Sequence, residues 1–246
     1  MFETALRYPV DGDDRIETIV IGGLLTLFSW LLIPAVFVAG YLQRVLARTT
    51  ADDRAPSFDD WGDLFGEGLK AVAVTLAYFA VPVVLLTAVL GSVIFAFETT
   101  TVVETGTTVA EPAAPGGANN LGVVVVLVGF ALAVVASLAA SYALPAALAR
   151  LAVEGRLGAA FEFRRLAGVL TDRSYAIGWL VAFVVLAVGG ALVGGLASIP
   201  LVGWALVPFA SFYLNVVAFA LYGQGYRDAT RTDRRETADG DRRTSA

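Results

Sequence analysis

Long apolar runs that are almost free of charge dominate this chain. Five such runs cover residues 19–46, 69–97, 121–148, 175–199 and 201–222, and a charge enters them only near an end. A helix needs about 20 apolar residues to cross roughly 30 Å of hydrocarbon. Because lipid offers the backbone no hydrogen bonds, such runs must be helical. We therefore predict an all-α, polytopic helical membrane protein with about five apolar blocks.

The composition also limits the chemistry that the chain can perform. Hydrophobic residues make up 57% and charged residues 16% of the sequence, which contains no Cys and no His. These absences remove disulfides, thiol nucleophiles, the commonest metal ligand and the usual near-neutral acid or base. We predict no enzyme, no catalytic residue and no cofactor, although chemistry at a carboxylate-only metal site stays open. No basic polar domain is present to bind nucleic acid.

The distribution of arginine predicts the orientation in the membrane. The loops at 44–70 and 149–173 and the tail after residue 226 are rich in Arg, whereas residues 98–120 carry acidic side chains but no cation. Basic loops stay in the cytoplasm. We expect a multi-pass plasma-membrane protein with residues 98–120 outside and the C-terminus cytoplasmic. Residues 1–227 would form one helical membrane domain, and residues 228–246 a disordered cytoplasmic tail.

The first apolar block allows two interpretations. A single straight span of residues 19–46 would place the N-terminus outside. A re-entrant hairpin that folds back at residues 29–34 would place both ends inside. Arginines on both sides of the block, together with Gly22, Gly23 and Pro34, suit the hairpin, because glycine and proline interrupt helices or allow close backbone approach. We favour the hairpin and keep the single span open.

Two segments in the arginine-rich loops, on the predicted cytoplasmic side, are predicted to be amphipathic helices rather than spans. In residues 57–70 one arc of the helix is apolar, and it comprises Phe58, Trp61, Leu64, Phe65 and Leu69. The opposite arc is acidic, and it comprises Asp59, Asp60, Asp63 and Glu67. Ser57 is the expected N-cap. Residues 157–170 repeat the pattern with Arg164 and Arg165 on the polar face.

The acidic helix is the most distinctive candidate site, together with Trp61 on its apolar arc. Its carboxylates could bind a cation or a partner, but the spacing of a calcium loop is missing, so an interfacial helix is the simpler interpretation. Helices that bind lipid headgroups normally carry cations, so we expect this one to dock on protein near Arg164 and Arg165. Inside the spans, Asn215 is the most polar residue, and we expect it to hydrogen-bond across helices rather than bind a solute.

Several motifs resemble one known family. They are Gly22-Gly23, Pro34, Gly40-Tyr41, Arg44, the string Phe58-Asp59-Asp60-Trp61-Gly62-Asp63-Leu64-Phe65, Gly68-Leu69-Lys70 and Tyr222-Gly223-Gln224-Gly225-Tyr226-Arg227. Over about residues 2 to 230 the chain is similar to the domain of unknown function 4013 (DUF4013) family of uncharacterised prokaryotic membrane proteins, abundant in haloarchaea. The acidic composition with a single lysine also suits a salt-adapted proteome. The resemblance implies a multi-pass membrane protein and no known activity.

Two functions remain after these exclusions. The first is a non-enzymatic module that organises the membrane or binds partners, whether lipid, other membrane proteins or a second copy of itself. The second is a channel or permease component for a neutral or unknown solute, which the paired helix breakers would suit.

Overall fold

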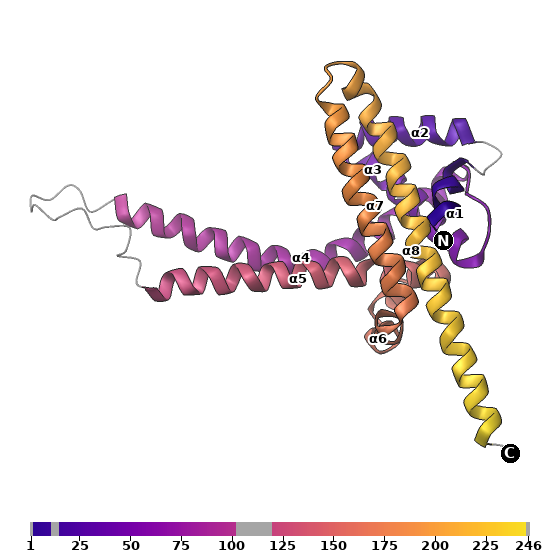
Figure 1. The fold of residues 1–246 in the computed structure, drawn as a ribbon. Helices are drawn as coiled ribbons and strands as arrows, with labels where there is room; N and C mark the ends of the chain where they lie inside the picture. Colours follow the sequence, from indigo (N-terminus) through magenta and orange to yellow (C-terminus); the bar gives the residue numbers. More distant parts are fainter. Residues whose placement is uncertain (1, 11–14, 102–119, 245–246) are drawn as a thin grey trace, which may run out of the picture. The chain divides into compact units, whose positions relative to one another are not determined.

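All regular structure in the described part of the chain is helical (Figure 1). The computed structural model describes residues 2–10, 15–101 and 120–244. The elements are α1 (Phe2–Arg7), η1 (Tyr8–Val10), α2 (Arg15–Leu27), η2 (Ser29–Leu31), α3 (Ile33–Ala51), α4 (Trp61–Thr101), α5 (Asn120–Glu154), η3 (Leu157–Phe161), α6 (Phe163–Thr171), α7 (Arg173–Ala197) and α8 (Val202–Thr244). The all-α prediction is confirmed.

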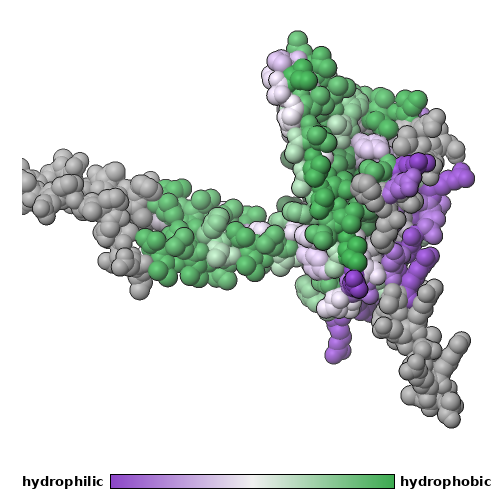
Figure 2. Space-filling model, viewed as in Figure 1, coloured by the Kyte–Doolittle hydropathy of each residue, from purple (hydrophilic) through white to green (hydrophobic). Residues whose placement is uncertain are grey.

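Four of these helices are long and apolar enough to cross a bilayer. The stretches are Trp61–Ile94, Gly122–Glu154, Arg173–Ala197 and Val202–Arg231. Figure 2 shows their apolar side chains as green surfaces along α4, α5 and α7. This architecture is that of a helical polytopic membrane protein.

The helices group into two compact units, and the expectation of one membrane domain over residues 1–227 stays a prediction. The first unit contains Met1–Thr75 and Tyr142–Ala246, and the second contains Leu76–Ser141. In the second unit α4 and α5 pack on each other, and Gly129 brings α5 against the Val89 side chain of α4. This unit is therefore a helical hairpin that packs on itself.

The core of the first unit forms around α8. Helices α7, α3 and α2 all pack against it, and its buried residues include Phe212, Val216 and Leu221. Between α7 and α8, Gly178 and Gly225 meet backbone to backbone, so that a Cβ on Gly178 would lie 2.9 Å from Gly225 Cα. Small residues at such crossings let membrane helices pack closely where lipid removes the hydrophobic driving force.

The first apolar block is broken into two helices, as the hairpin interpretation predicts. Helix α2 ends at Leu27, η2 follows, and α3 begins at Ile33 after Leu32, whose φ is 64°. With 13 residues, α2 is about 20 Å long and cannot cross a 30 Å core. The break exposes Trp30 and Leu32, both 76% accessible. Residues 19–46 are therefore not one straight helix.

The two predicted amphipathic segments start and end differently from the expectation. Ser57 is not an N-cap, because α4 begins at Trp61 and the Asp60 carbonyl accepts the first helical bond, from Leu64 N. Residues 56–60 stay out of the helix because Tyr41 Oη donates to Pro56 O and Arg44 donates to Asp59 O. The second segment divides at Glu162 into η3 and α6.

Helix α8 extends into the segment after residue 227, and the expectation of a disordered tail at 228–246 stays a prediction. Helix α8 continues without interruption to Thr244. The sequence after residue 227 contains no proline and one glycine, so nothing stops a helix whose nucleus already exists in the packed part of α8.

Candidate functional site

Arg44 of α3 is the centre of a charged cluster at the start of α4. Its Nε donates to Glu67 Oε2 at 2.9 Å, and its Nη1 donates to Asp59 Oδ1 at 3.0 Å and to Asp59 O at 2.8 Å. The Arg44 side chain is only 16% exposed. A guanidinium has several donors in a fixed plane, so one residue can hold two carboxylates and a main-chain carbonyl together. Arg44 thus ties the 52–60 loop and α4 to α3.

The four acidic residues that were predicted to form one site therefore make different contacts. Asp59 and Glu67 bind Arg44, and Asp60 contributes its main-chain carbonyl, which lies 3.4 Å from Arg44 Nη2. Asp63 is exposed. In the sequence, Arg44 indicated the orientation, the hairpin and the family resemblance, but it was not predicted as a site residue. The one signal for its role was that it is the only cation inside the first apolar block.

Aromatic side chains of α3 and of residues 58–65 pack together beside this cluster. Phe58 stacks on Tyr41 with ring centroids 4.4 Å apart, and Phe37 meets Trp61 edge-on at 5.3 Å and Phe65 at 5.4 Å. Such aromatic pairs contribute about 0.5–1.5 kcal/mol each beyond their buried area. Of the predicted apolar arc, Leu64 is fully buried, whereas Trp61, Phe65 and Leu69 stay 44%, 38% and 54% exposed.

Helices α3 and α4 cross at two glycines. A Cβ on Gly68 would overlap the Val36 carbonyl oxygen and lie 2.9 Å from Gly40 N, and a Cβ on Gly40 would overlap the Leu64 carbonyl oxygen. The backbones therefore touch directly at this crossing. Any side chain at either position would push α4 away from α3 and from Arg44.

A second charged cluster closes the loop between α5 and α6. Arg150 is 5% exposed; it donates from Nε to Ala159 O at 3.1 Å and from Nη2 to Glu154 Oε1 at 2.5 Å and Glu162 Oε2 at 2.9 Å. Arg156 bridges the same two glutamates at 2.6 and 2.5 Å. Its hydrogen bond holds the pKa of Glu162 below the usual value of 4.5. This network explains why the helix expected at 157–170 breaks at Glu162.

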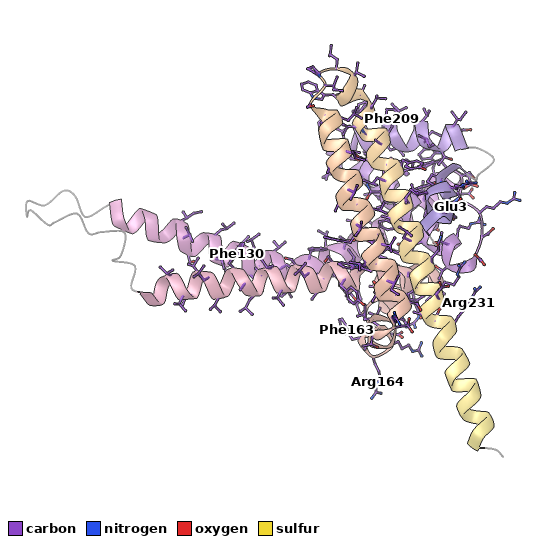
Figure 3. All side chains as sticks on the ribbon, in the orientation of Figure 1. Glu3, Phe130, Phe163, Arg164, Phe209 and Arg231 are labelled. Atoms are coloured by element: carbon purple, nitrogen blue, oxygen red, sulfur yellow. The ribbon has the colours of Figure 1, made fainter. Side chains whose placement is uncertain are left out.

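The expected docking of the acidic helix on Arg164 and Arg165 is not formed among the described residues. Arg165 lies 3.4 Å from Glu162 in its own segment. Arg164 is exposed and points away from the helices (Figure 3). The Asp59 and Glu67 carboxylates pair with Arg44 instead, because the glycine crossing brings α3 against α4.

Asn215 makes its contact within its own helix. Its Nδ2 donates to Ser211 O, one turn back on α8, at 2.8 Å. The cross-helix hydrogen bond that we expected is not among the contacts of the described residues. A carbonyl acceptor so close along the same helix satisfies the Asn215 Nδ2 group without a partner helix.

A third group of charges joins the loop after α3 to α8. Arg227 pairs with Asp52, and Arg48 Nη1 lies 2.5 Å from Asp53 Oδ2. Beside them Gly223 approaches the buried Thr49 side chain, so that α3 and α8 touch there as well. Within the described ranges, no group of three or more acidic residues is arranged to hold a metal ion.

These clusters lie within or next to the region that defines the relationship to known proteins. A family model described as Protein of unknown function (DUF4013) matches residues 27–199. The chain belongs to this family. No curated protein and no solved structure matches the chain. The DUF4013 region contains both the Arg44 and the Arg150 clusters, but it ends before α8, the helix on which α2, α3 and α7 pack.

The family model matches a shorter stretch than the resemblance noted in the sequence, so only some of the motifs lie inside it. The string at 58–65 and the glycine at 68 fall inside it, whereas Gly22-Gly23 and residues 222–227 fall outside. The DUF4013 assignment gives no activity. What the arrangement can do must therefore come from its helices and its charged clusters.

Proposed function

We propose that this chain is a non-enzymatic membrane module that organises or binds membrane partners in the plasma membrane, with its charged clusters and C-terminus in the cytoplasm. The observation that carries this proposal is the exposure of the spanning helices. In α4, α5 and α7 only 11% of the most apolar window is buried inside the chain, against 39% in α8. Three of the four spans therefore offer broad apolar faces to lipid or to other membrane helices.

The charged clusters support the orientation. Arg44, Arg150 and Arg227 are held by carboxylates at span ends that the distribution of arginine assigns to the cytoplasm. They stabilise the connections between spans and leave the helix faces as the surface for partners. The acidic composition with one lysine fits a salt-rich haloarchaeal cell.

A photo-crosslinking amino acid on the exposed faces tests partner binding. We expect Leu192→photo-leucine, where the native side chain is 72% exposed on α7, to form a discrete protein adduct in intact cells. Val217→photo-leucine is the matched control, since Val217 is fully buried on α8 and should crosslink only within the chain. Spans that crosslink to nothing but lipid at Leu192, Leu90 and Leu127 would contradict partner binding through these faces.

The second candidate, a channel or permease component, is favoured by one specific observation. The break at η2 and Leu32 interrupts an apolar block, as in the discontinuous helices of many transporters. Flux of small neutral solutes into proteoliposomes separates the candidates. We expect uptake equal to that of empty vesicles. Uptake above that level, abolished by straightening the break with Pro34→Ala, would replace our proposal with the second candidate.

A further inference from the structure

A cavity of about 140 Å³ opens beside the Arg44 cluster, between α3, α4 and α5. All of its lining lies within the first unit. The polar residues of its wall are Gln43, Arg44, Glu67 and Lys70, and the remaining wall is formed by Ala47, Leu151, Ala152 and Gly155. The volume suffices for about four or five groups of the size of a water molecule.

The cavity carries one cation that no carboxylate neutralises. Arg44 is occupied by Asp59 and Glu67. Lys70, the only lysine of the chain, donates to Gly155 O at 3.3 Å and forms no ion pair within the described ranges. Both carboxylates lie against Arg44, so Lys70 is the cation of the wall that no carboxylate contacts. An anion in the cavity would find the Lys70 ammonium available.

Gln43 adds a buried acceptor that lacks a donor. The residue is 4% exposed, and its Nε2 donates to Leu148 O at 2.8 Å. This bond identifies which end of the amide is the nitrogen, and the shielded Gln43 Oε1 has no partner among the described residues. A buried acceptor without a donor is costly. A ligand with a hydroxyl group, after a small movement of the Gln43 side chain, would satisfy it.

The sequence places this cavity at the depth of lipid headgroups. On α4, Lys70 is the last charge before the uncharged residues 71–97, and on α5, Arg150 is the first charge after the uncharged residues 121–149. Both helices therefore leave the hydrocarbon at the cavity. The proposed function places the charged clusters in the cytoplasm, and this inference rests on that orientation. The cavity then faces the cytoplasmic leaflet.

We infer that this cavity binds the phosphate of an anionic lipid whose headgroup also carries a free hydroxyl. Lys70 holds the phosphate, and Gln43 Oε1 accepts from the hydroxyl. Basic pockets between membrane helices on the cytoplasmic side recognise anionic headgroups in this way. A lipid suits the site better than free phosphate because a single lysine is weak against a dianion in water, and because Ala47, Leu151 and Ala152 offer an apolar wall.

Thermal melting of the full-length protein in a neutral detergent tests the site, with phosphatidylglycerol titrated as the probe. We expect phosphatidylglycerol to raise the melting temperature in a saturable manner, and phosphatidylcholine to have little effect. Lys70→Gln should weaken the apparent affinity about 5- to 10-fold, and Lys70→Arg should restore most of it. Arg164→Gln is the matched control, because it removes one exposed cation outside the cavity and should leave the affinity unchanged.

Two further probes separate the sources of the phosphate and the role of the hydroxyl. Phosphatidylmethanol, which has the same charge without a hydroxyl, should bind more weakly than phosphatidylglycerol, and equal binding would overturn the role of Gln43. Inorganic phosphate should have little effect at the same concentration. An equal effect of phosphate, equal losses in the Lys70 and Arg164 variants, or no preference over phosphatidylcholine would each overturn the lipid site. Because the assay uses isolated protein, these failures would leave partner binding and topology unaffected.

Discussion

Gly68→Ala should lower the stability of the folded protein by about 3 kcal/mol, in the upper range for overpacking a close contact. The added methyl group would overlap the Val36 carbonyl oxygen, and neither of the two backbones at the crossing can move as a side chain can. Separation of α4 from α3 would also pull Glu67 from Arg44. We expect the melting temperature in detergent to fall by about 6 to 12 °C.

Gly66→Ala is the control in the same turn of α4. A Cβ at Gly66 would have nothing within 4 Å, so this change should stabilise the helix by up to about 1 kcal/mol. If both variants melt at the same temperature, the backbone contact between α3 and α4 does not exist as described.

Arg150→Met should have the second largest effect, about 2–3 kcal/mol. Removing one partner of a buried ion pair costs about 3–5 kcal/mol, but Glu154 and Glu162 are 26% and 29% exposed and keep Arg156. The loss should be local. Hydrogen exchange of residues 155–165 should accelerate, and the melting temperature should fall by several degrees.

Arg164→Met provides the comparison for Arg150, since Arg164 lies on the neighbouring helix with an exposed side chain. Its melting temperature should change by less than about 2 °C, as is usual for surface substitutions. Glu162→Gln combined with Arg150→Met should cost less than the sum of the two single changes, because both act on one network. Additive losses would show that the Arg150 network does not hold the loop.

The helical membrane architecture could be predicted because it depends only on local composition. The apolar runs appear as the membrane-length stretches of α4, α5, α7 and α8, and the punctuation around Pro34 indicated the break between α2 and α3. These features need no knowledge of which helices meet. The apolar character of such a run does not depend on which helix packs against it.

The partners within the site could not be predicted, because they depend on which helices cross. Arg44 meets Glu67 only because Gly40 and Gly68 let α3 and α4 touch. Many glycines in the sequence look alike, and only the structure distinguishes Gly68 from Gly66. The assignment of the acidic residues to Arg164 and Arg165 failed for this reason.

The start of α4 was misplaced for a related reason. Local sequence favours Ser57 as a cap, but tertiary bonds from Tyr41 and Arg44 hold residues 56–60 outside the helix. The helical continuation of α8 to Thr244 likewise follows from its packed first half. Composition alone carries no information about a helix nucleus that lies upstream.

Accessibility of single cysteines tests the membrane topology most directly, because the native chain has no Cys and each introduced thiol is unique. With a membrane-impermeant maleimide on intact cells, Thr107→Cys should react, whereas Gly158→Cys and Ala246→Cys should react only after permeabilisation. Labelling of Gly158→Cys in intact cells while Thr107→Cys is protected would contradict the orientation. Recovery of the chain in the soluble fraction without detergent would contradict the membrane assignment itself.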